Sequence, residues 1–220
     1  MPHEAVQIPA SDATIDGDLL IPSNPTGLVI FAHGSGSSRF SQRNRAVAAA
    51  LSEGGFATLL LDLLTRGEES ADHHSGRFRF DIDRLAARVI AAIDWSAMHH
   101  ALSALPIACF GASTGAAAAL MGAAARPARV RAVISRGGRP DLADDILPRV
   151  EAPTLLIVGG HDEPVIELNE AARRRLRAPA QTVIVPGATH LFEEPGALEQ
   201  VAGLALEWCR IYLKTGSSGS

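Results

Sequence analysis

A serine flanked by two glycines gives this chain a possible nucleophile. Ser113 stands at the centre of Gly111-Ala-Ser-Thr-Gly115, directly after the apolar run 107–110 and before an alanine-rich stretch. Such a turn between a strand and a helix holds the serine in a strained conformation and exposes its hydroxyl above the sheet. The motif predicts a nucleophile for acyl transfer. The alternative is a glycine-bounded turn whose serine only caps the helix.

A serine hydroxyl is a weak nucleophile unless a base accepts its proton. Among the eight histidines, His190 has the best position, because it follows the last strand-like run and precedes the last helix-like stretch. Asp162 follows the preceding strand-like run and could orient the imidazole and stabilise its cation. The Asp162-Glu-Pro sequence also suits a helix N-cap with proline in the first turn. Glu163 and Asp62 are the substitute acids.

A glycine-rich loop can supply the hydrogen-bond donors that an oxyanion needs. His33-Gly-Ser-Gly-Ser-Ser follows the apolar run 28–32. A tetrahedral oxyanion requires two or more donors fixed in advance. We expect the backbone N–H groups of Ser35 and Thr114 to form this oxyanion hole, with Gly34 as the alternative to Ser35. Taken alone, the loop would be an ordinary turn after a strand.

The elements that bring these residues together can be predicted from the apolar runs. Six continuous runs lack polar alternation, which is typical of strands buried on both faces of a parallel sheet. They lie at 28–32, 56–61, 107–110, 130–134, 154–158 and 182–185. Helix-like stretches separate them, at 43–53, 81–98, 114–125, 164–176 and 195–212. The alternation predicts a mostly parallel, doubly wound α/β sheet with ligands at the carboxyl ends of the strands.

The remaining segments set the limits of the domain. Alternating residues at 6–8 and 14–19, with an Asp16-Gly17 turn signal, predict an antiparallel pair of edge strands. The connection 135–153 has room for one short helix, around 142–147, and for no large cap domain. We expect a single domain over residues 1–214. The Gly- and Ser-rich segment 215–220 resembles a flexible tail left from cloning.

Composition excludes several classes of protein. Hydrophobic residues make up 47% and charged residues 20% of the chain, which opposes disorder. A net charge of −4 provides no basic field for nucleic acid or an anionic membrane. Cys109 and Cys209 stand among apolar residues and predict buried thiols in a reducing compartment. With no secretory signal and no bilayer-spanning run, we expect a cytoplasmic protein with a small-molecule partner.

Two further motifs carry weaker signals. In Ser135-Arg-Gly-Gly-Arg-Pro-Asp141, arginines near a strand end could hold a carboxylate or phosphate, so Arg136 is a possible substrate-binding residue. An Arg–Asp surface turn is the alternative. His73 and His74 fall in segment 65–80, which we interpret as a polar loop without the frame of a zinc site. We therefore expect no metal and no cofactor.

Four motifs together resemble the dienelactone hydrolase-related branch of the α/β-hydrolase superfamily. They are His33-Gly-Ser-Gly-Ser-Ser, Gly111-Ala-Ser-Thr-Gly, Gly159-Gly-His-Asp and Gly187-Ala-Thr-His. The resemblance covers residues 4–213 and implies an α/β-hydrolase fold without a large cap. The chain order Ser113, Asp162, His190 is that of the superfamily.

The resemblance also implies an activity. Dienelactone hydrolases use a cysteine nucleophile where this chain has Ser113, which points to a general carboxylesterase. The expected reaction is hydrolysis of a carboxylic ester through an acyl-enzyme on a Ser-His-Asp triad. The alternatives are an acyltransferase or perhydrolase with the same triad, and a non-catalytic binding module on the same fold.

Overall fold

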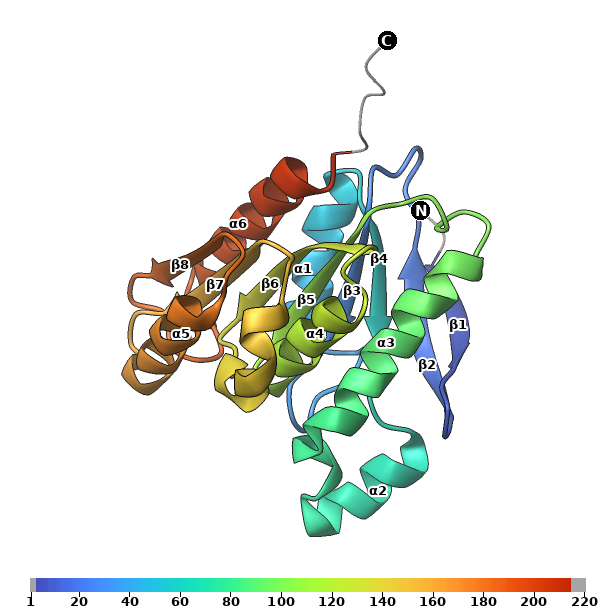
Figure 1. The fold of residues 1–220 in the computed structure, drawn as a ribbon, viewed down its shortest axis with the longest axis horizontal. Helices are drawn as coiled ribbons and strands as arrows, with labels where there is room; N and C mark the ends of the chain where they lie inside the picture. Colours follow the sequence, from blue (N-terminus) through green and yellow to red (C-terminus); the bar gives the residue numbers. More distant parts are fainter. Residues whose placement is uncertain (1–2, 215–220) are drawn as a thin grey trace.

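The computed structural model describes residues 3–214, which form an eight-stranded sheet between two layers of helices (Figure 1). The strand order is β1-β2-β4-β3-β5-β6-β7-β8. Strands β3 to β8 run parallel, and β2 pairs antiparallel with both β1 and β4. The sheet is therefore mostly parallel and doubly wound, which confirms the fold class predicted from the apolar runs.

The strands coincide with those runs and extend several of them. They are β1 (His3–Pro9), β2 (Thr14–Leu20), β3 (Leu28–Ala32), β4 (Ala57–Leu61), β5 (Ile107–Ala112), β6 (Val130–Arg136), β7 (Thr154–Gly159) and β8 (Ala180–Val185). All residues of β3, β4, β5 and β7 are buried, because helices cover both faces of the central sheet. The same expectation is wrong for β8. As the edge strand it is only partly covered, and Ile184 is exposed.

The antiparallel edge pair β1–β2 is present, but its turn is not where the dipeptide signal predicted it. Ala10 donates its N–H to the carbonyl of Ala13, at 2.7 Å, and this closes the turn. Asp16 and Gly17 lie inside β2 instead. A side chain at position 17 would meet Leu59, since a Cβ there would lie 3.1 Å from its Cδ1. Close packing between strands therefore explains this glycine.

Six α-helices connect the strands: α1 (Gln42–Glu53), α2 (Arg66–Ser75), α3 (Ile82–Met98), α4 (Thr114–Ala125), α5 (Glu163–Arg175) and α6 (Ala197–Tyr212). Helices α1 and α6 pack on one face of the sheet, over a core that contains Phe31, Phe110 and Trp208. Helices α3, α4 and α5 pack on the other face, as Figure 1 shows. Because α4 is largely alanine and glycine, it can approach the sheet closely and is almost wholly buried.

Helix α2 corrects the interpretation of segment 65–80 as a loop. Thr65 Oγ1 accepts the N–H of Glu68, and the Glu68 carboxylate accepts the N–H of Thr65, which is a complete capping box. Gly76 ends the helix in the left-handed conformation, with φ 63°. The helix lacks an apolar face, so periodicity could not reveal it, although the Thr-x-x-Glu pattern could have. His73 and His74 therefore stand on a helix.

The connection after β6 holds the 3₁₀ helix η2 (Pro140–Arg149), longer than the expected short helix but too small for a cap domain. Another 3₁₀ turn, η1 (Phe78–Phe80), joins α2 to α3. Within residues 3–214, no helix combines the length and the apolarity needed to cross a membrane. The tail predicted at 215–220 lies outside the described residues.

The two cysteines are free and buried, as predicted. Burial raises the pKa of the Cys109 thiol to about 12, and the pKa of Cys209 likewise to about 12. Both thiols are therefore protonated at neutral pH and serve as core side chains.

Candidate active site

Ser113 occupies a sharp turn between β5 and α4, with φ 50° and ψ −123°. Two close backbone approaches enforce this turn. A Cβ at Gly111 would lie 2.3 Å from Ala116 Cα, and a Cβ at Gly115 would lie 2.3 Å from the carbonyl oxygen of Ala32. Neither contact is possible for a larger residue. The half-buried serine is thus held in a backbone conformation that non-glycine residues rarely adopt.

His190 and Asp162 form a direct hydrogen bond. The Nδ1–H of His190 donates to Asp162 Oδ2, at 2.6 Å. Asp162 follows β7, and His190 lies in the loop after β8, so neighbouring strands bring them together. Asp162 is also the N-cap residue of α5, which has proline in its first turn, but its carboxylate accepts no N–H of that helix. A carboxylate in this position orients the imidazole and stabilises its cation.

The turn after β6 connects the serine with the histidine. The N–H of Ser113 donates to the Arg136 carbonyl at 3.3 Å, and the Arg139 N–H donates to the Ser113 carbonyl at 3.0 Å. A Cβ at Gly137 would lie 3.5 Å from His190 Cε1. Within residues 3–214, no hydrogen bond joins Ser113 Oγ to His190. In unliganded enzymes such contacts are commonly long and tighten when substrate binds.

The glycine-rich loop after β3 packs directly on the serine. A Cβ at Gly34 would lie 2.9 Å from Ser113 Cβ, so only glycine permits this approach. The hydroxyls of Ser35 and Thr114 lie 3.0 Å apart, and the Ser35 hydroxyl also donates to the Arg79 carbonyl, at 3.2 Å. In the described part of the chain, the backbone N–H groups of Ser35 and Thr114 find no protein acceptor. Both groups therefore keep an unused hydrogen-bond donor.

His33 holds this loop rather than facing the serine. Its Nδ1–H donates to the Gly34 carbonyl at 2.9 Å, and its Nε2 accepts the N–H of Leu63 at 3.0 Å. Burial lowers the pKa of His33 below its usual value, so the ring is neutral at physiological pH. A neutral ring is also what the two hydrogen bonds require, since Nε2 must accept.

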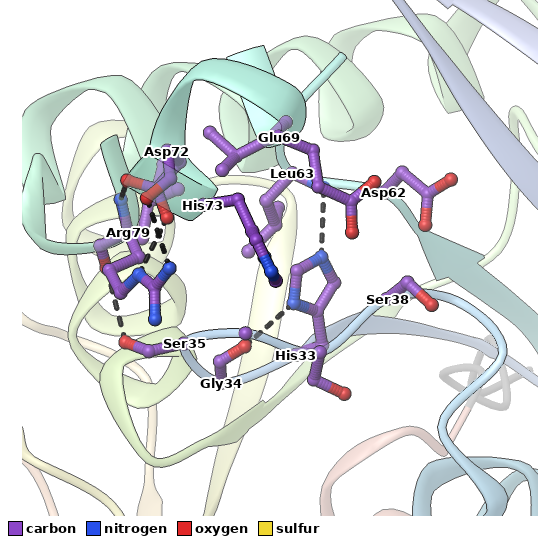
Figure 2. A pocket seen from close by; sticks show the side chains of 14 residues that line it. His33, Gly34, Ser35, Ser38, Asp62, Leu63, Glu69, Asp72, His73 and Arg79 are labelled. Carbon is purple, nitrogen blue, oxygen red and sulfur yellow. Dashed lines mark hydrogen bonds and ion pairs between the residues drawn. The ribbon is translucent and has the colours of Figure 1, made fainter. Parts of the chain in front are cut away.

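A pocket of about 190 Å³ opens on the outer side of this loop (Figure 2). Ser35 lines it from the loop, and Leu63 lines it from the segment after β4. Helix α2 forms the opposite wall, where Glu69 and His73 face the pocket in Figure 2. The interpretation of segment 65–80 as a polar loop did not predict that this wall is helical.

In the described chain, neither substitute acid forms a hydrogen bond with His190. Asp62 accepts the backbone N–H of Arg39 at 2.7 Å and forms an ion pair with the Arg39 guanidinium. Glu163 is exposed in the first turn of α5. Asp162 is therefore the carboxylate that contacts His190.

The two arginines of the Ser135–Asp141 motif have different environments. Arg139 forms a two-point ion pair with Asp141, with distances of 2.9 and 2.7 Å, which is the surface turn of the alternative interpretation. Arg136, by contrast, is buried. Within residues 3–214, no group of three or more His, Cys, Asp and Glu side chains is arranged to hold a metal ion.

The parallel sheet, the strained serine turn and the loops at the strand ends define an α/β-hydrolase. The chain belongs to the dienelactone hydrolase family, whose model matches residues 15–210. A crystal structure of a dienelactone hydrolase from Anabaena variabilis shares 54% sequence identity, with a TM-score of 0.95 over 97% of this chain and 99% of that one. This membership confirms the resemblance and supports hydrolase activity.

More distant and longer relatives also match. The structure of Est1E from Butyrivibrio proteoclasticus with bound ferulic acid superposes with a TM-score of 0.78 at 20% identity, covering 94% of this chain and 100% of that one, and shares the fold. Two Mycobacterium tuberculosis proteins that carry the name "Putative phosphoribosyl transferase" are 55% identical over 93% of this chain. The chain spans only 45% of their length.

A side chain at either glycine that flanks Ser113 should destabilise the turn and the folded protein. We predict that Gly115→Ala lowers the free energy of unfolding by roughly 2 kcal/mol or more, since its Cβ would meet backbone atoms that cannot move aside. Denaturant unfolding followed by circular dichroism measures this loss. Gly203→Ala is the matched control, because a Cβ there meets nothing within 4 Å in helix α6. The control should gain roughly 0.5–1 kcal/mol. Equal effects of the two substitutions would contradict the steric argument.

His33 should make stability depend on pH. In the unfolded chain it takes up a proton near its usual pKa, whereas burial lowers the pKa in the folded protein. Protonation below about pH 6.5 therefore favours the unfolded state. We predict that the free energy of unfolding falls from about pH 7 to pH 5, with His33 contributing up to ~1.4 kcal/mol per pH unit.

Chemical denaturation at several pH values measures this slope. His33→Gln should flatten it, because an amide does not titrate in this range. The control is His100→Gln, which replaces an exposed histidine and should leave the slope unchanged. A slope that survives in His33→Gln would mean that His33 is not buried in its neutral form.

Proposed function

We propose that this protein is a serine hydrolase that cleaves carboxylic esters. Ser113 Oγ attacks the ester carbonyl while His190 Nε2 accepts the hydroxyl proton, and Asp162 orients the imidazole. The backbone N–H groups of Ser35 and Thr114 stabilise the oxyanion of the tetrahedral intermediate. When this intermediate collapses, the alcohol leaves with the proton from His190, and an acyl-enzyme remains. Water, deprotonated by His190, then releases the acid and restores Ser113.

One observation carries the proposal. Ser113 stands in a strained turn and its N–H donates to the carbonyl of Arg136. The next residue, Gly137, lies against His190, whose Nδ1–H donates to the Asp162 carboxylate at 2.6 Å. This combination of a strained serine, an imidazole and a carboxylate is the arrangement that a nucleophile, its general base and an orienting acid require. The backbone N–H groups of Ser35 and Thr114 support the same reaction, because neither has a protein acceptor in the described chain and both would be free to stabilise an oxyanion.

The pocket of about 190 Å³ beside the glycine-rich loop is lined by Ser35 and by Leu63, Leu64 and Leu85, but by neither Ser113 nor His190. We expect an acyl group on Ser113 to extend past Ser35 into this pocket. Because its volume lies below that of drug-sized ligand sites, short acyl groups should be cleaved faster than long ones. We attribute the transferase name of the mycobacterial relatives to the part of those proteins that this chain does not match.

Removal of the nucleophile should abolish most of the activity. We predict that Ser113→Ala lowers kcat for a short-chain aryl ester by ~10³-fold or more, since no acyl-enzyme can form. A fluorophosphonate probe should label the native protein at Ser113 and leave the variant unlabelled, as mass spectrometry would detect. Thermal unfolding controls for folding of the variant. Undiminished hydrolysis by a correctly folded Ser113→Ala protein would refute the proposed nucleophile.

The two neighbouring acids offer a matched test of the triad. We predict that Asp162→Asn lowers kcat on the order of 10³-fold, because the amide cannot hold the imidazole in the required tautomer. Glu163→Gln, one residue away and exposed, should retain kcat within about twofold. Steady-state kinetics on the same ester measures both. The assignment would be wrong if the Glu163 variant were the one that lost activity.

A further inference from the structure

The side chains of the two expected oxyanion donors contact each other. Ser35 Oγ and Thr114 Oγ1 lie 3.0 Å apart, and the Ser35 hydroxyl donates to the carbonyl of Arg79 at 3.2 Å. Thr114 is buried and Ser35 is half-buried, so little solvent competes for these bonds. The proposed mechanism uses only the backbone N–H groups of Ser35 and Thr114 and gives their hydroxyls no role.

The directions of these hydrogen bonds follow from the protons available. A serine hydroxyl carries one proton, and a backbone carbonyl can only accept. The Ser35 proton goes to the Arg79 carbonyl, so the contact with Thr114 requires the Thr114 hydroxyl to donate to Ser35 Oγ. The two bonds form a short chain that runs from helix α4, through the glycine-rich loop, to the 3₁₀ turn η1.

The η1 end of this chain is held by Asp72. The Asp72 carboxylate accepts the N–H groups of Phe78 at 2.6 Å and Arg79 at 3.0 Å, and it pairs with the Arg79 guanidinium at 2.6 Å (Figure 2). Asp72 is also the one buried residue of α2. The Arg79 carbonyl, to which a dashed line from Ser35 runs in Figure 2, is therefore part of a well-connected turn.

The peptide group that carries the Ser35 N–H is oriented from inside its own loop. Its carbonyl belongs to Gly34 and accepts the Nδ1–H of His33 at 2.9 Å and the N–H of Ser37 at 3.2 Å. Both partners lie in the same loop, so these bonds orient the peptide but do not fix its distance from α4. In the described chain, the backbone N–H and carbonyl of Ser35 make no hydrogen bond of their own.

The hydroxyl pair is what joins this loop to α4. Within residues 3–214, no other hydrogen bond connects segment 33–38 with that helix. Packing of Gly34 against Ser113 keeps the two segments from approaching further. The bond between Ser35 and Thr114 keeps them from moving apart. Contact and hydrogen bond together define the separation of the two N–H groups.

We propose that the hydroxyls of Ser35 and Thr114 are positioning groups, which set the distance between the two backbone N–H groups that receive the oxyanion. The inference rests on the proposed esterase function and explains how its oxyanion hole is preorganised. Such donors are effective only when they already lie about 2.7–3.1 Å from the place that the oxyanion will occupy. A displaced donor weakens the transition state more than the less charged ground state, so the hydroxyls affect kcat more than KM.

Removal of each hydroxyl with the backbone kept intact tests this role. Thr114→Val and Ser35→Ala both retain the N–H groups. Each should lower kcat for 4-nitrophenyl acetate about tenfold and change KM less than about twofold, since displacement of a donor costs less than the roughly 10²–10³-fold loss of a missing one. Thr114→Ser restores the hydroxyl and should keep kcat within about threefold of the native value. Native kcat in both Thr114→Val and Ser35→Ala would overturn the proposal.

The effects of the two substitutions should not add, because both hydroxyls act through one contact. Ser35→Ala combined with Thr114→Val should keep kcat within about twofold of the less active single variant. Independent effects would instead multiply to a loss of about a hundredfold. A multiplied loss would contradict a shared positioning role.

Thr154→Val is the matched control for general destabilisation. Thr154 is buried, and its hydroxyl donates to the Ala152 carbonyl at 3.0 Å, but it begins β7 and so lies at the end of the strand opposite Asp162. This variant should lower the melting temperature about as much as Thr114→Val and change kcat less than about twofold. A similar loss of kcat in both would show that destabilisation alone is the cause and would overturn the proposal.

A binding measurement makes the test independent of turnover. Ser113 Oγ adds to the carbonyl carbon of 1,1,1-trifluorobutan-2-one, its proton passes to His190, and the hemiketal oxyanion takes the place of the reaction's oxyanion. Fluorine NMR measures the Kd of this adduct. The Kd should rise about tenfold in Thr114→Val and in Ser35→Ala and stay within about twofold in Thr154→Val. An unchanged Kd in both hydroxyl variants would overturn the proposal.

The failure of the positioning role differs from the failure of the enzyme. Ester hydrolysis by the native protein, with native kcat in both hydroxyl variants, would overturn the role and leave the esterase intact. Absence of both hydrolysis and the ketone adduct in the native protein would refute the esterase and with it the role of the hydroxyls.

Discussion

The close approach of helix α4 to the strands beneath it is the constraint on which the site depends. A Cβ at Gly111 or Gly115 would lie too close to backbone atoms of neighbouring segments, and a Cβ at Gly34 would lie too close to the Cβ of Ser113. These three close approaches accompany the positive φ of Ser113 and restrict the orientation of its side chain. The strain is sustained by the buried alanine face of α4, whose small side chains let helix and sheet approach each other.

Parallel strands then gather the other groups at one edge. The loops after β3, β5, β6, β7 and β8 all leave from their carboxyl ends, so residues far apart in the chain meet around the serine. His190 and Asp162 come from adjacent strands, and Gly159 permits the β7 loop to lie against the β8 loop, since a Cβ there would be 2.5 Å from the Ala188 carbonyl oxygen. The glycine-rich loop also lines two hollows, one bounded by α2 and the other by α1, the loop after β8 and the start of α6.

Charge is distributed unevenly around this edge. Near α2 the ionic groups are matched: Arg79 pairs with Asp72 at 2.6 Å, and Arg39 pairs with Asp62. Near α1, Arg43 pairs with Glu193 at 2.9 Å, and Glu194 and Glu199 also line the cleft, while the buried Arg136 has no acid partner in the described chain. Family membership explains the common scaffold, whereas such differences in the lining of the two hollows are where members of one fold acquire distinct substrates.

The sequence alone determined the local features. Continuous apolar runs predicted the parallel strands, the glycine spacing predicted the turn at Ser113, and the loop positions of Asp162 and His190 predicted their meeting. Each of these follows from short-range sterics or from the rule that parallel strands end at one edge. Only the tertiary structure decided that α2 packs against the pocket, that Asp16 and Gly17 lie within a strand, and that Arg136 is buried while Arg139 is not. Those outcomes depend on contacts between segments distant in the chain, and a polar helix or a single arginine carries no periodic signal of what it will pack against.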